Sequence, residues 1–481
     1  MTSKKIKVDE KVTRTLATYA AKTRYTQLPA NAIAAAKLAI LNIIAAALGG
    51  AQTRIGALHT QLAREIGGGV KQATIIGDGA RVSRPVAAYA NGGLAFALDY
   101  EDVCQYVLHA GPIVIPAALA LAEAQHSSGK DFLTSVVLGY EVGTRIGRAM
   151  QPTPARGAQV WGQQYTPFAA CVAAGRLLRL APAEMDVAFG ITGTYSPVPS
   201  AYKYFGVVAE TRPMREAKLG WGWMSMAGVM GALSAQAGFG GGHGILDGAE
   251  GFWIMAGSDR CDFAQMTEGL GSQWLILGTD YKMHPSIAWS HPPIVALKRL
   301  LREHAIKPRE VVRVRVWNVG VSRTADYAPV GAVDAQFSLP FAVATTLLGE
   351  PLTPALYSDA VLRSARVRGM LKRIECLADP AMDQDWFQGN RMRTRVEIQL
   401  TGARTVTASA MFPGDKPAYG FDQVIEKLHA MGGDLLRASQ LGRIVDTVER
   451  LEKIPDLAVL ARLLCPTGRS RITAAKAARR Q

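Results

Sequence analysis

The amino-acid sequence predicts a mainly α-helical protein, in which an all-helical domain is formed by both chain ends and an α+β lid domain is inserted between them. Apolar residues recur at helical spacing from residue 8 to about 275 and again after about 420. Between these stretches the spacing changes to the alternation that is typical of strands. A chain of 481 residues is also long enough for about two or three domains.

The first stretch is rich in alanine and leucine and is divided by glycine and proline into segments of helical length. Asp131, shortly after Gly129, is a candidate cap for a helix with apolar residues at helical spacing. The segments that we expect to be helices are 31–48, 113–126, 131–149, 166–179 and 223–238.

Two later segments predict strands. EVVRVRVWNVG (310–320) alternates Val312, Val314 and Val316 with arginines, which is typical of a half-buried strand. The segment 393–414 predicts two strands joined by a turn at a Thr-Gly pair.

Helices are predicted again around and after these strands. Ser338 can cap a short helix in 337–350, Asp422 can cap the helix that follows it, and 444–453 continues the helical pattern. Four parts are therefore expected: a helical domain (8–275), an α+β lid domain (276–418), a helical return to the first domain (419–468) and a basic disordered tail (469–481).

Composition narrows the class of protein. With 49% hydrophobic and 19% charged residues, the chain is not of the disordered type. Its five cysteines are far apart, which predicts free thiols in a reducing compartment and no disulfide frame. The charged N-terminus lacks the apolar core of a secretory signal, so a cytoplasmic location is expected. Two apolar runs, 31–50 and 219–242, contain polar or many small residues and are expected to be buried helices rather than membrane spans.

The net charge of +15 arises from 54 basic and 39 acidic residues, and part of the excess lies at the two termini. No aromatic residue interleaves with the basic tail, so no nucleic-acid partner is expected. The remaining positive balance suits a small anionic substrate.

The segment LDYEDVCQYVLHAGP (98–112) holds the first candidate site. Asp99 follows a stretch of small residues, and His109 comes ten residues later, just before an apolar helix. If the loop brings both against the start of that helix, they can act as acid and base beside a bound carboxylate. The alternative is an ordinary acidic turn, and we interpret Glu101 and Asp102 as turn and surface charges.

Two further segments carry candidate residues. Lys218 precedes a long uncharged run, where it can be desolvated, bind a carboxylate as an ammonium, or simply extend from a helix end. Lys282, His284 and His291 lie where the helical pattern gives way to the α+β pattern. No carboxylate spacing supports a metal site there, so a catalytic or anion-binding histidine is the better functional interpretation, and a structural role stays open.

Several ordered blocks, including RPVAAYANGGLAFALDYEDV, AKLGWGWMSMAGVMGALSAQAGFGG and HPSIAWSHPPIVAL, resemble the MmgE/PrpD family over nearly the whole chain. That family includes 2-methylcitrate dehydratase, cis-aconitate decarboxylase and iminodisuccinate epimerase. The resemblance implies the domain arrangement above, a homodimer, and a pocket between the domains. It also implies that the catalytic residues are Asp99, His109, Lys218 and His291, with Lys282 as a weaker match.

The activity implied is that of a cofactor-independent lyase, without metal or organic cofactor, that removes a proton next to a carboxylate of a small carboxylic acid. His109 or Lys218 would exchange the proton, Asp99 would orient the histidine, and His291 would protonate the leaving group or hold a carboxylate. We expect a hydro-lyase like 2-methylcitrate dehydratase with an altered substrate. The alternatives are a decarboxylase, an epimerase or isomerase, and an inactive binding or scaffold homologue.

The chain departs from the family pattern at positions that are polar in many members. Gln164 takes the histidine position of the GxHxT-like segment WGQQYT, and apolar residues take other polar positions. This favours a substrate that is less hydroxylated or less charged than 2-methylcitrate. The residues that we expect to contact substrate are Phe96, Val103, Gln164, Thr166, Trp221 and Lys282.

Overall fold

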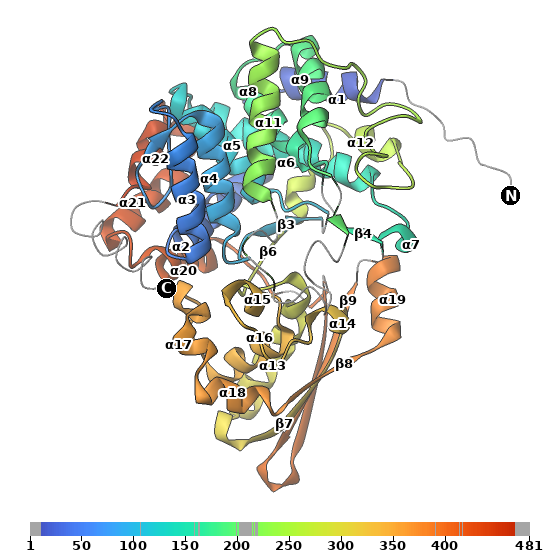
Figure 1. The fold of residues 1–481 in the computed structure, drawn as a ribbon, viewed down its shortest axis with the longest axis vertical. Helices are drawn as coiled ribbons and strands as arrows, with labels where there is room; N and C mark the ends of the chain where they lie inside the picture. The colour runs from blue at the N-terminus through green and yellow to red at the C-terminus, as the bar shows by residue number, and fades with distance from the viewer. Residues whose placement is uncertain are drawn as a thin grey trace, which may run out of the picture.

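The computed structural model describes residues 11–466, except for positions 106, 158, 162–163, 199, 202–213, 215, 217–219, 390, 413 and 416. The protein is mainly α-helical, as predicted. Helices from the first half of the chain and from its C-terminal end gather in one part of the molecule, and the largest sheet lies in the other (Figure 1).

The helical part contains elements from both ends of the described chain. Its core draws buried residues from 12–281 and from 424–464. The helices are α1 (Val12–Lys22), α2 (Ala30–Gly50), α3 (Arg54–Ile66), α4 (Arg84–Phe96), α5 (Gly111–Ala124), α6 (Gly129–Ala149), α7 (Pro154–Gly157), α8 (Thr166–Leu177), α9 (Pro182–Tyr195), α11 (Trp221–Gln236), α12 (Ala264–Thr267), α20 (Phe421–Gly432), α21 (Ala438–Glu449) and α22 (Ala458–Leu463).

Within the described residues, α2 is the helix long and apolar enough to cross a membrane by length and composition. However, 72% of its most apolar stretch is buried inside the protein. It packs against α4 and α20, so helices from the two ends of the chain cover it. Burial of this helix against the fold accounts for its apolar character.

The second part is built on a four-stranded sheet in the order β10-β9-β7-β8. β7 is antiparallel to β9 and parallel to β8, and β9 and β10 form the hairpin that the sequence predicts. The strands are β7 (Val311–Asn318), β8 (Ile374–Ala378), β9 (Met392–Leu400) and β10 (Thr405–Phe412). The helices of this part are α13 (His291–His304), α14 (Val321–Thr324), α15 (Ala332–Gln336), α16 (Leu339–Leu348), α17 (Asp359–Leu362), α18 (Ala365–Leu371) and α19 (Pro380–Gly389).

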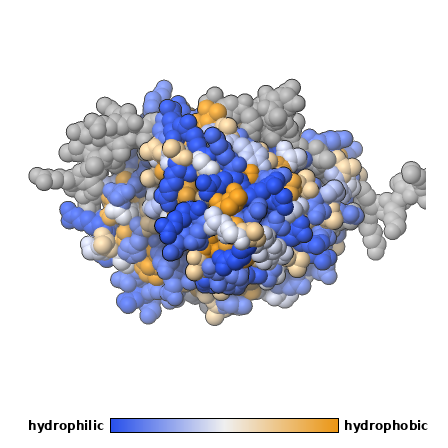
Figure 2. All heavy atoms as spheres, turned by 90° about the horizontal axis from the view of Figure 1, so that it is seen from below, coloured by the Kyte–Doolittle hydropathy of each residue, from blue (hydrophilic) through white to orange (hydrophobic). Residues whose placement is uncertain are grey.

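This part has its own core, with buried residues between 296 and 410. Leu98, Tyr100 and Met431 belong to the same core although they come from the helical part. The segment after α4 therefore lies at the junction between the two cores. The face at the sheet end of the molecule is largely hydrophilic with scattered apolar residues (Figure 2).

Three details differ from the sequence prediction. A register shift between Val311 and Arg313 leaves Val312 47% exposed, so the prediction that Val312 faces inward is wrong. The prediction that Asp131 caps α6 is also wrong. The cap is Ser128, whose hydroxyl accepts from the Asp131 N–H.

Asp422 is likewise not a cap, because α20 begins at Phe421 and Asp422 lies in its first turn. Ser338 does cap α16, accepting from the Phe341 N–H at 3.1 Å as predicted.

Candidate active site

The candidate site is built on the turn that follows α4. Asp99 has a φ of 51°, a left-handed conformation that aspartate tolerates better than most residues. The chain then enters β3 (Asp102–Cys104), which pairs antiparallel with β6 (Thr279–Tyr281). The Lys282 N–H donates to the Glu101 carbonyl at 3.1 Å. Two segments about 180 residues apart are thus held side by side.

Lys282 lies between two carboxylates. Its Nζ is 2.8 Å from Asp99 Oδ2 and 2.8 Å from Glu101 Oε1, and all three side chains are buried. Burial alone would lower the pKa of Lys282, but Asp99 and Glu101 outweigh it and raise that pKa above its usual value. Burial would likewise raise the pKa of Glu101, yet Lys282 and His109 hold it at about 2. Lys282 and Glu101 are therefore both ionised at neutral pH.

His109 contacts this group through Glu101. Its Nδ1 is 2.7 Å from Glu101 Oε1. Because an ionised carboxylate can only accept a hydrogen bond, Nδ1 carries the proton, and Nε2 is the basic nitrogen of the neutral ring. From the sequence, Asp99 was expected to orient the histidine. In the structure, the residue in contact with Nδ1 is Glu101.

Aromatic rings cover one side of His109. The His109 ring centroid is 5.0 Å from that of Trp221 and 6.0 Å from that of Phe96, and the two aromatic rings are 5.3 Å apart. Phe96 ends α4 and Trp221 begins α11, so the packing of these helices sets the position of the wall. Such rings exclude water from the imidazole and strengthen its interaction with Glu101.

Asp102 is fully buried and connects the turn to the helices behind it. Its carboxylate accepts from the Tyr140 hydroxyl at 2.7 Å and from the Gly111 N–H at 2.9 Å. Burial raises the pKa of Asp102 to about 6, although both hydrogen bonds oppose the shift. The interpretation of Glu101 and Asp102 as surface charges is wrong, because their partners are distant in sequence and cover them completely.

His291 is buried in a different environment. The Met283 N–H donates to its Nδ1 at 3.4 Å, so Nε2 carries the proton and faces the Ser286 carbonyl at 3.4 Å. Burial, reinforced by the charge of Lys282, lowers the pKa of His291 to about 3. The ring is neutral at physiological pH, so it cannot hold a carboxylate as a cation.

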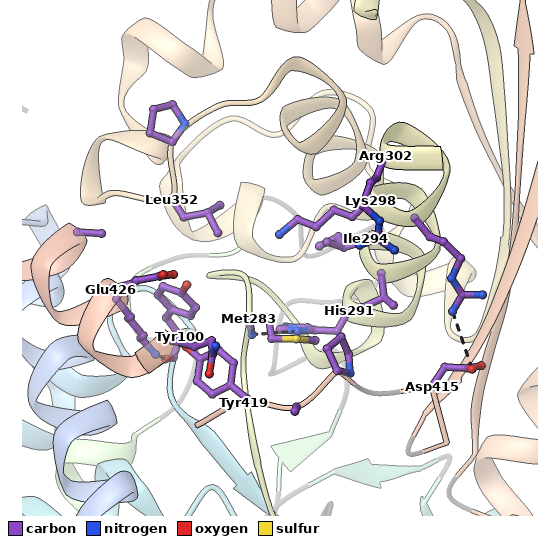
Figure 3. A pocket seen from close by; sticks show the side chains of 18 of the residues that line it. Tyr100, Met283, His291, Ile294, Lys298, Arg302, Leu352, Asp415, Tyr419 and Glu426 are labelled. Carbon is purple, nitrogen blue, oxygen red and sulfur yellow. Dashed lines mark hydrogen bonds and ion pairs between the residues drawn. The ribbon is translucent and has the colours of Figure 1, made fainter. Parts of the chain in front are cut away.

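The His291 ring lines a cavity of about 700 Å³. Figure 3 shows Tyr100, Tyr419 and Glu426 on one side of this cavity and Lys298 and Arg302 on the other, with His291 and Met283 between them. Tyr100, which lies between Asp99 and Glu101 in the chain, also lines this cavity. The residues whose side chains form the site are not part of the lining: Asp99, Glu101, His109 and Lys282.

The other predicted residues have separate positions. Lys218 lies outside the described residues. Val103 is buried in β3. Thr166 Oγ1 contacts Met224 Sδ at 2.9 Å, and Gln164 Nε2 donates to the Val198 carbonyl at 2.9 Å.

Gln164 is 2% exposed, and its Oε1 has no hydrogen-bond partner among the described parts of the chain. A buried carbonyl of this kind is a group that a ligand can satisfy. This observation supports its expected role in substrate contact, which stays a prediction.

Two contacts of the site could not be predicted from the local sequence. Glu101 lies two residues from Asp99, but Lys282, which keeps it ionised, is distant in sequence. Lys427, from α20, was missed altogether, and its Nζ donates to the Tyr100 carbonyl in the middle of the turn. No local pattern marks a single buried lysine on an amphipathic helix.

Comparison with known proteins identifies relatives of the whole chain. A family model of the MmgE/PrpD N-terminal domain matches residues 14–263, and one of the MmgE/PrpD C-terminal domain matches residues 284–453. The cis-aconitate decarboxylase of Aspergillus terreus is 25% identical over 470 residues, which is 91% of this chain and 93% of that protein. Human cis-aconitate decarboxylase is 24% identical over 405 residues, 80% of each chain. The cis-aconitate decarboxylase-like protein oryM of Aspergillus oryzae is 25% identical over 81% of this chain and 84% of its own.

Proposed function

Because the chain belongs to the MmgE/PrpD family, we propose that it is a cofactor-independent lyase acting on a small carboxylic acid by proton transfer at a carbon next to a carboxylate. The observation that carries this proposal is the buried series Lys282–Glu101–His109. It supplies one basic nitrogen, His109 Nε2. Glu101 fixes the tautomer of the ring and stabilises the imidazolium.

The roles within the series follow from the contacts. Lys282 keeps Glu101 ionised, and Glu101 accepts the Nδ1–H of His109. Nε2 then exchanges a proton with substrate carbon, and the imidazolium that forms is stabilised by the adjacent carboxylate. The Lys282 ammonium contacts Asp99 as well as Glu101, and Glu101 keeps its hydrogen bond to His109.

Among reactions of this kind, decarboxylation is the one we favour. The relatives that match most of the chain are named cis-aconitate decarboxylases. The wall formed by Phe96 and Trp221 also suits it, because a carboxylate in poorly hydrated surroundings loses its charge when it leaves as carbon dioxide. The carbon–carbon bond breaks, its electron pair is delocalised over the adjoining carbon–carbon double bond, and His109, which has taken a proton from solvent on Nε2, delivers that proton to a carbon of this system. From the sequence we expected a hydro-lyase, with a decarboxylase among the alternatives.

Several further assignments are part of the same proposal. Lys218 would bind a substrate carboxylate, and Gln164 Oε1 would accept a hydrogen bond from substrate. The sheet-bearing part would act as the lid over the helical part, in a homodimer located in the cytoplasm. The family resemblance supports the role of Lys218, the lid and the homodimer. The unpartnered Oε1 supports the role of Gln164, and the cytoplasmic location is the expectation from the sequence.

The first prediction concerns turnover of cis-aconitate by the purified full-length chain. Carbon dioxide and the organic product are measured together, and we expect decarboxylation that falls about 10²- to 10⁴-fold in His109→Gln. His126→Gln is the matched control, because His126 is an exposed histidine paired with Asp456 on the surface. Addition of water to cis-aconitate without release of carbon dioxide would replace decarboxylation with the reaction of a hydro-lyase, and unchanged turnover in His109→Gln would overturn the assignment of the base.

A further inference from the structure

The turn 97–101 is held by its backbone carbonyls. The Gln336 side chain donates from Nε2 to the Ala97 carbonyl at 3.0 Å, and the Lys282 N–H donates to the Glu101 carbonyl at 3.1 Å. These donors come from segments far along the chain. A turn with a left-handed Asp99 needs such contacts, because they offset the cost of its backbone conformation.

The third carbonyl of the turn, that of Tyr100, accepts from Lys427. The Nζ of this lysine also donates to Asn42 Oδ1 at 2.7 Å and lies 3.7 Å from the centroid of the Tyr100 ring. Lys427 is on α20 and Asn42 is on α2, and Lys427 is only 4% exposed. The Lys427 side chain therefore links α20 and α2 to the turn.

The position of this contact is what connects it to the chemistry. The Tyr100 carbonyl lies in the backbone between Asp99 and Glu101, the two residues whose carboxylates meet at Lys282. A displacement of this peptide moves both carboxylates, and Glu101 also carries the contact to His109. Placement errors of about 1 Å can reduce catalysis by about 100-fold.

The charges around Lys427 set its protonation. Burial lowers its pKa to about 7, Glu101 and Asp102 act against this shift, and Lys282 adds to it. Lys427 and Tyr100 both line the cavity of about 700 Å³, and Tyr100 is labelled in Figure 3. The other titratable groups that line this cavity are His291, Lys298, Arg299, Arg302, Asp415, Tyr419 and Glu426.

We propose that Lys427 is a positioning residue for the proton-transfer site: it holds the Tyr100 carbonyl so that Asp99 and Glu101 both reach Lys282 and Glu101 keeps its bond to His109. The proposal deepens the proposed function and rests on it for its catalytic consequence. In this proposal α20, which belongs to the C-terminal group of helices, helps to arrange a site whose other side chains come from earlier in the chain.

The test, our second prediction, compares Lys427→Met with Lys298→Met. Methionine keeps much of the length of lysine but has neither charge nor donor. Lys298→Met removes a cation from the same cavity, and Lys298 forms no hydrogen bond or ion pair with the turn among the described residues. The readout that needs no substrate is the ¹⁵N NMR signal of the His109 ring, assigned with His109→Gln. We expect the Nδ1–H tautomer in the wild type and in Lys298→Met, and a mixture of tautomers in Lys427→Met.

Turnover of cis-aconitate gives the second readout. For Lys427→Met we expect kcat to fall about 10- to 100-fold with KM changed less than about threefold. We also expect an alkaline loss of activity near pH 7 that is present in the wild type and in Lys298→Met and absent in Lys427→Met. Lys427→Arg keeps the charge and the donors, and if the methionine variant does not fold, this variant is expected to retain the tautomer and lose the alkaline limb.

A His109 tautomer that is the same in Lys427→Met as in the wild type would overturn the proposal, as would an equal effect of Lys298→Met. If the wild type turns over no carboxylic acid, the proposed function fails, and the NMR comparison still decides the positioning role of Lys427.

Discussion

Glu101 joins Lys282 to His109, since its Oε1 is 2.8 Å from Lys282 Nζ and 2.7 Å from His109 Nδ1. A buried carboxylate with one cationic partner and one histidine keeps its charge at neutral pH and fixes the proton on Nδ1. Its neighbour Asp102 has no cation within this network and instead accepts two neutral hydrogen bonds. Adjacent carboxylates thus have opposite pKa shifts.

The third prediction follows from the pKa of Asp102, which burial raises from 3.8 to about 6. Between these values the folded state binds a proton that the unfolded state has released. The contribution of Asp102 to the free energy of unfolding is therefore largest below about pH 4 and is lost as pH rises through 6. The contribution is about 3 kcal/mol at about 1.4 kcal/mol per pKa unit.

Asp102→Asn should remove this dependence, because an amide does not titrate and can keep the hydrogen bond from Gly111. Denaturant unfolding at pH 4.5 and 7.5 measures the difference between wild type and variant. Equal pH dependence in the two proteins would show that Asp102 does not titrate in this range. Glu101, with its pKa lowered to about 2, contributes in the opposite direction and at lower pH.

At the level of elements, the packing of α4 against α11 sets the aromatic wall beside His109. The helices approach closely at Gly222, where an added Cβ would lie 2.3 Å from the Tyr89 carbonyl oxygen. Gly92 faces the same contact, because a Cβ there would lie 3.0 Å from the Gly222 Cα. Trp221 directly precedes this contact, so the close approach and the position of its ring are linked.

Gly222→Ala is the fourth prediction. The added methyl group must push α11 away from α4, which we expect to cost about 1–3 kcal/mol of unfolding free energy and to lower kcat by moving Trp221 from His109. Gly442→Ala is the control, since nothing lies within 4 Å of a Cβ there and the helix α21 should gain about 0.5–1 kcal/mol. Thermal unfolding measures both, and a neutral Gly222→Ala would mean that the helices can separate without cost.

The elements differ in how far the sequence predicts them. Long helices such as α2 and α6 and the β9–β10 hairpin follow from local spacing, and their bounds agree to within a few residues. β8 was missed because it has only five residues and pairs in parallel with a strand far away in sequence. The bulge in β7 and the burial of Glu101 are set by partners that no local pattern reveals.

At the scale of the whole molecule, the candidate site lies where the two cores meet. Phe96 and Trp221 belong to the helical core, and Leu98 and Tyr100 belong to the core of the sheet-bearing part. Two lysines from distant parts of the chain donate hydrogen bonds to carbonyls of the turn 97–101: Lys282 through its backbone N–H, and Lys427 of α20 through its Nζ. The sequence blocks name Asp99 and His109 as candidate residues, which stays a prediction, and the partners of these residues depend on this long-range arrangement.

The fifth prediction tests the central claim, which is that the Lys282–Glu101–His109 series moves a proton at a substrate carbon. The measurement is the decarboxylation of cis-aconitate in heavy water, with the product followed by NMR. We predict one carbon-bound deuterium from solvent per product molecule in the wild type, with the rate of its appearance reduced about 10²- to 10⁴-fold in His109→Gln. Undiminished incorporation in His109→Gln, or a wild type that exchanges no carbon-bound hydrogen with solvent for this acid or related ones, would contradict the account.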